Sequence, residues 1–342
     1  MVRAVAPLRI SFVGGGTDFP HWYADHGGAV LSTTIDHSVR VSIQLRDDRQ
    51  IRVRSLDLGH LVEYRIDERP RYDGIMDLAK AAIERIGVAK GIDVSIDSDA
   101  PPGSGLGGSS ALVVATLAGL AALEERSLSR EELARIAYAI EREDLGIAGG
   151  WQDQYAAVFG GFNLIEFSRV GVAVNPVPTG PELLDRLRER LLLCYTGGVR
   201  NDVGLIDAQI RMHAEGREET LLGMKLLQAM AYSMRDAVAD DRLDDLGSML
   251  GEAFDSKKKM NPHVARGTRI EEMLGAAREA GAIGGKLCGA GGGGYLLTYA
   301  PPERRASVRA ALERMGGQFA RFDFSSTGVR ARSGERVWAP GR

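Results

Sequence analysis

Glycine-rich segments are the first candidates for chemistry in this sequence. Residues 103–108 (GSGLGG) follow two prolines and precede the apolar run at 111–123. Glycines let backbone N–H groups close around an anion, and the N-terminus of a following helix favours negative charge. The segment therefore predicts a phosphate-binding loop. The alternative is a glycine-rich turn that only allows a strand and a helix to pack.

Two common kinds of phosphate loop fit this segment poorly. A Rossmann dinucleotide loop needs a strand that runs directly into the first glycine and an acidic residue about 20 positions later. Here DSDAPP separates the expected strand from Gly103, and the candidate acids Glu124 and Glu125 fall at a helix end. A Walker loop needs a lysine after its last glycine, and no lysine occurs between Lys90 and Lys225. A Rossmann-type oxidoreductase is thus the weaker hypothesis.

Asp153 is the main candidate for a catalytic side chain outside the glycine loops. It lies in GGWQDQYAAVFGG, between a glycine pair and the apolar run YAAVF. A carboxylate in such a place is partly shielded from water and can act as a base. The simpler alternative is that Asp153 only caps a helix.

The composition is that of a globular protein with room for two domains. The chain has 342 residues, of which 44% are hydrophobic and 26% charged. A formal net charge of −3 gives no reason to expect nucleic acid or an anionic membrane as a partner. The two distant cysteines fit a reducing compartment, and no leader or stretch long enough to span a bilayer is seen. We therefore expect a cytoplasmic protein; whether it forms a homodimer is left open.

The apolar periodicity predicts an α+β protein whose elements would position these residues. Strands are expected over 4–13, 39–45, 50–54, 61–66, 91–97, 159–167, 170–177, 191–195 and 284–299. Helices are expected over 74–88, 109–124, 129–145, 201–214, 218–238, 242–254, 268–280 and 302–315. Prolines and a glycine at 176–181 place a domain boundary near 178–190, which divides the chain into 1–180 and 181–342.

Three segments together resemble the three motifs of the GHMP kinases. They are APLRISFVGGGTDF at 6–19, the loop P-P-G-S-G-L-G-G-S-S at 101–110, and GGKLCGAGGGGYLL at 284–297, in that order. The resemblance implies an N-terminal domain like ribosomal protein S5 domain 2 and a C-terminal ferredoxin-like α/β domain. It also implies that ATP is bound by backbone amides, a helix N-terminus and Mg²⁺, without a Walker lysine.

The resemblance also implies roles for individual residues. Asp153 would be the base and Arg9 a neighbouring cation that favours its ionised form, while Glu141 and Ser109 would hold Mg²⁺. Because Gly108 stands where relatives often have another serine, Ser110 is the alternative metal ligand. The expected ATP-binding residues are Pro102, Gly103, Ser104, Gly105, Leu106, Gly107, Gly108, Ser109, Ser110, Lys286, Gly289 and Gly291.

Residues 14–18 bear on the identity of the acceptor. Galactokinases have G-E-H-T-D where this chain has GGGTD at 14–18, which argues against galactose. Residues 14–36, 195–209 and 256–263 resemble the bacterial D-glycero-D-manno-heptose 7-phosphate kinases within the family. That resemblance implies transfer of the γ-phosphoryl group of ATP to the anomeric C1 hydroxyl, which gives the 1,7-bisphosphate. Its expected substrate-binding residues are Gly15, Gly16, Thr17, Asp18, Arg200, Lys257 and Lys258.

Three alternatives remain at this stage. The acceptor could be fucose or an unphosphorylated hexose, or the protein could bind sugar or nucleotide without catalysis. The three consecutive lysines at 257–259 could also be a solvated helix end with no ligand.

Overall fold

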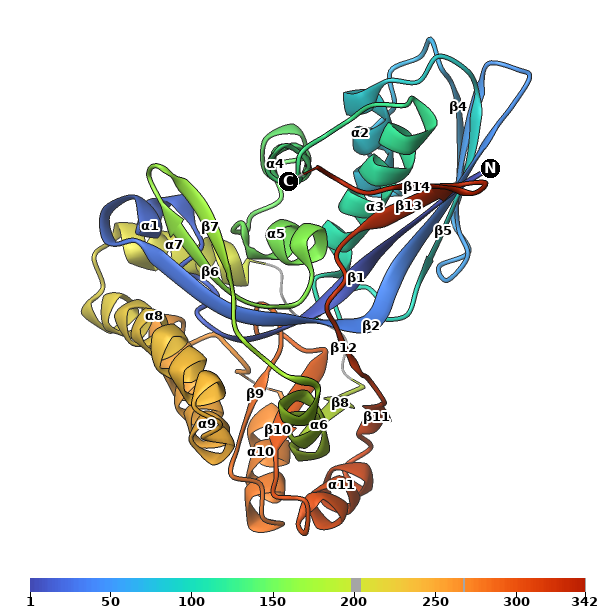
Figure 1. Cartoon of the computed structure of the whole chain (residues 1–342). Helices are drawn as coiled ribbons and strands as arrows, with labels where there is room; N and C mark the ends of the chain where they lie inside the picture. Colours follow the sequence, from blue (N-terminus) through green and yellow to red (C-terminus); the bar gives the residue numbers. More distant parts are fainter. Residues whose placement is uncertain (198–203, 267, 342) are drawn as a thin grey trace.

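The computed structural model describes residues 1–197, 204–266 and 268–341, whose strands form two sheets (Figure 1). The larger sheet contains β1 (Val2–Val13), β2 (Gly28–Leu45), β3 (Gln50–Ser55), β4 (Leu61–Arg65), β5 (Ile92–Ser98), β6 (Phe162–Ser168), β7 (Gly171–Pro176), β12 (Phe324–Ser325), β13 (Arg330–Ser333) and β14 (Arg336–Trp338). The smaller sheet contains β8 (Leu191–Tyr195), β9 (Gly284–Leu287), β10 (Tyr295–Tyr299) and β11 (Gln318–Ala320).

The larger sheet is built on β1 and β2. Its strand order is β14-β13-β1-β2-β5-β3-β4, with β6 and β12 also paired with β2 and β7 paired with β6. β2 is long enough to serve two neighbours: residues 28–33 pair with β6 and residues 39–45 pair with β5. The sequence predicted only 39–45 as a strand. Residues 28–35 are buried throughout, so they lack the alternation that marks a strand with one face in water.

Helices cover both sheets. They are α1 (Pro20–His26), α2 (Asp77–Ile86), α3 (Gly108–Leu123), α4 (Arg130–Ala139), the π-helix η1 (Ile140–Asp144), α5 (Gln152–Phe159), α6 (Pro181–Arg190), α7 (Leu205–Ala214), α8 (Glu218–Ala239), α9 (Leu243–Met260), α10 (Ile270–Glu279) and α11 (Arg305–Arg314). The expected capping box at the start of α4 is present, because Ser129 and Glu132 exchange hydrogen bonds between side chain and backbone.

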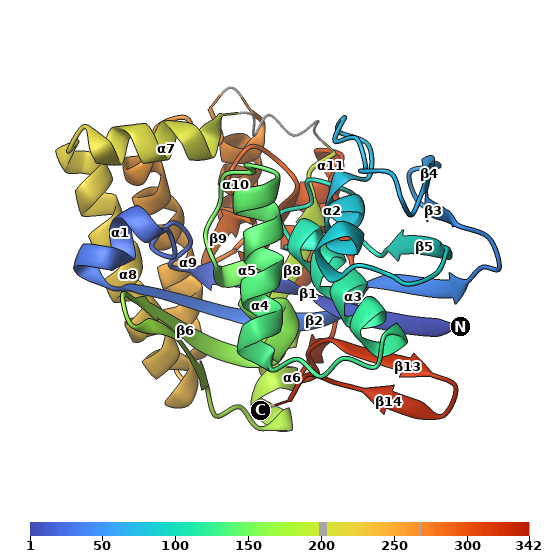
Figure 2. The same cartoon turned by 90° about the horizontal axis from the view of Figure 1, so that it is seen from above.

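A layer of helices covers β1 and β2 (Figure 2), and several of its residues line the cavity described below. α3 and α5 contact β1 and β2 directly, and α2 and α4 pack beside α3. α3 is apolar around most of its circumference, which suits a helix enclosed by a sheet and three other helices. α8 packs on β2 while its partner α9 packs on β9, so this pair joins the larger sheet to the smaller one.

Some elements differ from the sequence-based expectation. α1, α5 and α6 were not predicted, because each is short and starts or ends at glycine or proline. The helix expected to end at residue 254 continues to Met260 as α9. The lysines at 257–259 therefore occupy its last turn, where positive charge complements the helix dipole.

The C-terminal strands return to the larger sheet. β13 pairs with β1 and β12 pairs with β2, although both strands lie near the C-terminal end of the chain, after the smaller sheet (Figure 1). A division into 1–180 and 181–342 remains a prediction, and residues 324–325 and 330–333 pair with strands from the first of these parts. The expected α+β class is confirmed. No helix in the described ranges combines the length and the apolar character that a bilayer crossing requires.

Candidate active site

One cavity of about 1120 Å³ brings the three glycine-rich segments together. Its wall contains residues 14–16 after β1, residues 102–105 and 107–110 before and at the start of α3, and residues 289–290 after β9. These segments are far apart in the sequence, and they meet because β1 contacts α3 and also accepts hydrogen bonds from Lys286 of β9. The cavity therefore contains most of the loop residues that the sequence nominated for ATP.

The second and third glycine-rich segments are in direct backbone contact. A Cβ on Gly289 would lie 2.5 Å from the Cα of Gly105, and one on Gly105 would lie 2.7 Å from the carbonyl of Cys288. Both glycines also have positive φ, +81° at Gly105 and +68° at Gly289, which side chains disfavour. The backbone N–H of Tyr295 donates to the carbonyl of Ser104 over 3.0 Å and ties the same two segments. Glycine is required here for close approach.

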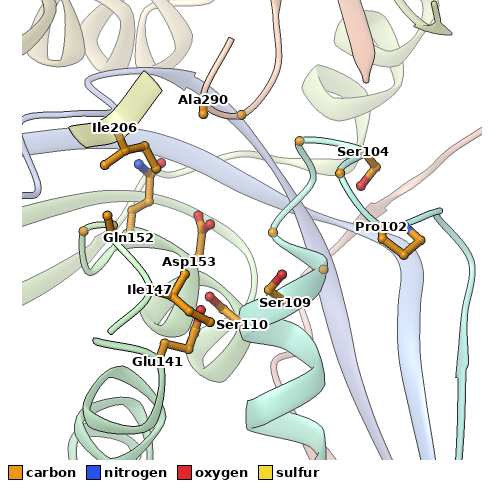
Figure 3. A pocket seen from close by; sticks show the side chains of 18 of the residues that line it. Pro102, Ser104, Ser109, Ser110, Glu141, Ile147, Gln152, Asp153, Ile206 and Ala290 are labelled. Atoms are coloured by element: carbon orange, nitrogen blue, oxygen red, sulfur yellow. The ribbon is translucent and has the colours of Figure 1, made fainter. Parts of the chain in front are cut away.

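The start of α3 is a free helix N-terminus at the cavity wall. Gly107 is the N-cap with φ +77°, and no side chain caps the first turn. The unpaired N–H groups of a long helix attract anions, and its dipole adds to that attraction. Ser109 is exposed in this turn, whereas Ser110 is buried and points toward Glu141 (Figure 3). The geometry suits a polyphosphate without a lysine in the loop.

Arg9 joins the candidate base to the glycine loop. Its Nε donates to Oδ1 of Asp153 over 2.8 Å, and its second terminal nitrogen lies 2.7 Å from the same oxygen. The remaining terminal nitrogen donates to the carbonyl of Gly105 over 2.6 Å. Arg9 is only 5% exposed, so these contacts hold its charge at the cavity floor. Asp153 lies in the first turn of α5, and no hydrogen bond to its Oδ2 is present in the described part of the chain.

A buried carboxylate lies beside Asp153 in a small polar cluster. Gln154 Nε2 donates to Oε1 of Glu141 over 2.6 Å and to Oγ of Ser110 over 3.1 Å. Burial raises the pKa of Glu141, and the nearby Arg142 guanidinium partly opposes this. Glu141 lies in the first turn of the π-helix η1, a local widening that is frequent at functional sites. Gln154 therefore links Ser110 to Glu141. The sequence left the choice between Ser109 and Ser110 open, and in the structure Ser110 is the serine beside Glu141.

The donor set of this cluster fits Mg²⁺. A carboxylate and a hydroxyl are hard oxygen ligands, and Mg²⁺ usually takes few protein ligands and completes its shell with water and phosphate. Within the described ranges no group of three or more His, Cys, Asp and Glu side chains could hold a metal alone.

Two lysines line the cavity near the third glycine-rich segment. Lys257 on α9 donates to the carbonyl of Gly289, and burial lowers its pKa to about 8. Lys286 on β9 donates to the carbonyls of Ser11 and Phe12 over 2.6 and 2.9 Å; burial, and then the charge of Lys257, lower its pKa to about 7. Both pKa values lie below that of a lysine in water, so the unfolded chain binds these protons more tightly. The resulting destabilisation is largest below pH 7 and is lost as the pH rises toward ~10.4.

Asp18 organises the part of the cavity wall that follows β1 and contains residues 14–16. Its side chain is fully buried, and burial raises its pKa. Oδ1 accepts from the N–H of Gly16 over 2.8 Å, and Oδ2 accepts from the backbone and side-chain nitrogens of Gln152 over 3.1 and 3.2 Å. Thr17 is also buried, and its hydroxyl bonds to the carbonyls of Gly14 and Ala29. These two residues shape the loop, and Asp18 also lines the cavity. The direct contact with the substrate that the sequence indicated for them stays a prediction.

Several nominated residues do not line this cavity. Leu106 is a buried side chain whose carbonyl accepts from the N–H of Arg9, and Gly291 lies against Val264 beside a separate hollow. Lys258 forms ion pairs with Asp255 and Glu271 and lies over the Phe254 ring. Arg200 lies outside the described residues.

Sequence reasoning also missed residues that do line the cavity. Gln152 and Gln209 lie beside Gly15 and Gly16, and Tyr72 and Met76 are further lining residues. Gln152 had a signal, because it directly precedes Asp153 in the motif. Gln209 ends the segment 195–209 that resembles the heptose 7-phosphate kinases, but nothing in that segment gave it a role of its own. Nothing in the sequence around residue 72 marks a binding site.

Comparison with known proteins identifies the family. The model of the GHMP kinases N terminal domain matches residues 74–161, and the model of the GHMP kinases C terminal domain matches residues 234–318. A D-glycero-alpha-D-manno-heptose 7-phosphate kinase of Campylobacter jejuni is 34% identical over 96% of this chain and 98% of its own length. The chain belongs to the GHMP kinase family. The resemblance of the three glycine-rich motifs is thereby confirmed, and so is the GHMP kinase fold.

Other GHMP kinases are similar over nearly the whole chain. The crystal structure titled a D-glycero-D-manno-heptose 1-phosphate kinase from Bacteroides thetaiotaomicron superposes with a TM-score of 0.81, at 29% identity over 97% of this chain and 99% of that one. Lactococcus lactis galactokinase complexed with galactose has a TM-score of 0.76 at 21% identity, over 96% of this chain and 94% of that one, and so shares the fold. A bifunctional fucokinase/GDP-fucose pyrophosphorylase of Arabidopsis thaliana is 27% identical over 93% of this chain but only 31% of its own length.

The lysine pKa values predict pH-dependent binding of a phosphate group. An anion next to Lys257 favours its charged form, so binding near pH 8 should take up a proton. We expect affinity to fall about tenfold between pH 7.5 and 9.5, and Lys257→Met to remove this dependence. Calorimetry of ATP and of sugar phosphates, each in two buffers of different ionisation heat, measures the uptake. It also identifies which ligand's phosphate contacts Lys257.

Lys258→Met is the matched control for this experiment, because Lys258 is the adjacent lysine but is ion-paired outside the cavity. It should keep the full pH dependence. Binding of every phosphate ligand without proton uptake in the wild type would contradict the placement of Lys257 next to a phosphate.

Proposed function

We propose that this GHMP kinase transfers the γ-phosphoryl group of ATP to the anomeric C1 hydroxyl of D-glycero-D-manno-heptose 7-phosphate. The observation that supports the proposal is the contact of Arg9 with both Asp153 and the carbonyl of Gly105, because the candidate base and the glycine-rich loop then share one cavity. The choice of acceptor is supported by the Campylobacter jejuni relative, at 34% identity over almost the full length of both proteins. A sugar-phosphate acceptor also agrees with the cationic residues Lys257 and Lys286 in the wall.

Asp153 acts as the general base in the proposed reaction. Both Arg9 contacts end on Oδ1, so Oδ2 is available to accept the proton of the acceptor hydroxyl. The hydroxyl oxygen then forms a bond to the γ-phosphorus while the bond between that phosphorus and the β–γ bridging oxygen breaks. ADP leaves with the bridging oxygen. The proton stays on Asp153 until solvent removes it.

The remaining groups hold the reactants and their charge. The free N–H groups at the start of α3 and the loop of residues 103–108 bind the phosphates of ATP, and Arg9 balances charge at the site of transfer. Glu141 and Ser110 would hold Mg²⁺, with Ser109 as the exposed alternative. When bound, this ion neutralises charge that develops on the phosphate oxygens.

Glu141→Gln tests the metal assignment. The amide keeps the shape of the carboxylate but loses its charge, so we expect Mn²⁺ affinity in the presence of ATP to fall about 10- to 100-fold, with a similar loss of activity at limiting Mg²⁺. Because burial raises the pKa of Glu141, the variant should fold at least as stably as the wild type. Calorimetric titration of Mn²⁺ and thermal denaturation measure the two effects. Unchanged Mn²⁺ affinity would move the metal away from Glu141.

A screen of ADP release across phosphorylated and free sugars tests the acceptor. We expect the highest kcat/KM for heptose 7-phosphate, and phosphorus NMR of the product should show a new anomeric phosphate. The names of the relatives mention both a 7-phosphate and a 1-phosphate, so the position has to be measured. Preference for fucose or a free hexose would transfer the proposal to that acceptor. Binding of sugar with no ADP from any of them would indicate a non-catalytic protein.

A further inference from the structure

Gln209 carries a hydrogen-bond donor that has no partner. The residue lies on α7, is 5% exposed and lines the cavity beside Gly16. Its Nε2 makes no hydrogen bond with the described residues. An unpaired buried amide destabilises a protein, and leucine would fill the same space without that cost. The residue is therefore poorly explained by packing alone.

Gln152 carries an unpaired acceptor on the neighbouring wall. Its backbone N–H and its Nε2 both donate to Oδ2 of Asp18, and this contact fixes which end of the amide faces that carboxylate. Oε1 is consequently turned away from Asp18, and it is buried without a partner in the described part of the chain. Asp18 thus acts as a positioning residue for an oxygen that accepts hydrogen bonds.

The two amides lie against two consecutive glycines. A Cβ on Gly15 would lie 3.1 Å from Nε2 of Gln152, and a Cβ on Gly16 would lie 2.8 Å from Nε2 of Gln209. A Cβ at either position would press against a glutamine amide, and at Gly16 also against Sδ of Met260, 2.9 Å away. Gln152 also points toward Ile206 of α7, the helix that carries Gln209 (Figure 3). Loop, α5 and α7 therefore place one unpaired donor and one unpaired acceptor around the same short segment.

We propose that Gln209 and Gln152 bind two hydroxyl groups of the acceptor sugar next to the hydroxyl that is phosphorylated. One hydroxyl accepts from Nε2 of Gln209, and the other donates to Oε1 of Gln152. Rotation about the last torsion of a glutamine is soft, so each amide reaches a ligand at low cost. A site built this way rejects acceptors that lack the hydroxyls, because the amides then stay unpaired. This inference rests on the proposed kinase function. It implies that the acceptor is a polyol and that the protein recognises it by the positions of its hydroxyl groups.

Gln209→Leu is the decisive variant. We expect kcat/KM for the intact acceptor to fall about 10- to 100-fold through KM, while KM for ATP is unchanged. Against the monodeoxy sugar that lacks the partner hydroxyl, wild type and variant should be equal. We also expect the melting temperature to be unchanged or higher, because an unpaired amide has been removed. A purely structural role would instead lower stability and affect all acceptors alike.

Gln228→Leu is the matched control. Gln228 is a glutamine on α8 that bonds to Trp22 and to the carbonyl of His26, outside the cavity. Its loss should lower stability and leave acceptor KM unchanged. If Gln209→Leu fails to fold, Gln209→Met gives the same comparison with a flexible chain of similar length.

The outcomes separate the two proposals. Wild-type turnover of a sugar phosphate, combined with an unchanged acceptor KM in Gln209→Leu, overturns the role of Gln209 and leaves the kinase function standing. Failure of the wild type to release ADP with any sugar overturns the proposed function, and this inference with it. Loss of discrimination between the intact and the deoxy acceptor in Gln209→Leu supports both.

Discussion

Asp153→Asn is expected to lower kcat about 10³-fold or more while leaving ATP affinity and thermal stability close to those of the wild type. The carboxylate is the only group in the Arg9–Asp153 pair that can take a proton from the acceptor, and positioned general bases contribute 10²- to 10⁴-fold. The amide can still accept from Arg9 through its oxygen, so the geometry of the cavity should survive. ADP release under saturating ATP and acceptor measures the effect.

The control for this variant is Asp93→Asn. Asp93 is also bound by an arginine, Arg46, but the pair lies outside the cavity. It should lose little activity. If Asp153→Asn retained wild-type kcat, Asp153 would no longer be a base, and the carboxylate would be assigned to the structure of α5.

Arg9→Lys is expected to have the second largest effect, a loss of about 10²- to 10³-fold in kcat. A guanidinium binds Asp153 and the carbonyl of Gly105 at once because its nitrogens form a planar fork. A lysine keeps the positive charge but offers one nitrogen, so it cannot hold both the base and the loop. The loss therefore measures positioning and charge at the site of transfer. Initial rates of ADP release, together with ATP affinity by calorimetry, separate the two contributions.

Arg46→Lys is the control for Arg9→Lys, because Arg46 also binds two partners at once but lies outside the cavity. Arg46 contacts Asp48 and Asp93, and its replacement should change activity less than threefold. A similarly small effect of Arg9→Lys would show that the contact between Arg9 and Gly105 is not needed for transfer.

The sequence predicted the residues that backbone chemistry requires. Gly105 and Gly289 lie where two backbone segments are in contact and leave no room for a side chain. Such positions require glycine, so they appear in the sequence as a glycine-rich motif. The resemblance to the GHMP kinases also implied that Arg9 and Asp153 are neighbours, and the two side chains are hydrogen-bonded, while the role of Asp153 as a base stays a prediction. By contrast, the first part of β2 and the short helix α5 could not be predicted, since burial on both faces and short length remove the periodic signal.

The choice between adjacent residues could not be made from sequence. Successive residues on a helix point about 100° apart, so adjacent lysines face different surroundings. Lys257 faces the cavity, whereas Lys258 faces Glu271. The same holds for Ser109 and Ser110 at the start of α3. Their roles depend on where α9 and α3 are rotated by packing, and this is a property of the whole fold.

The most direct test of the account is a crystal structure with Mg²⁺ and a non-hydrolysable ATP analogue. The account predicts that the triphosphate lies along residues 103–110 at the start of α3, with the terminal phosphorus facing Asp153 and the metal on Glu141. A nucleotide bound away from this loop, or a terminal phosphate out of reach of Asp153, would contradict phosphoryl transfer in this cavity.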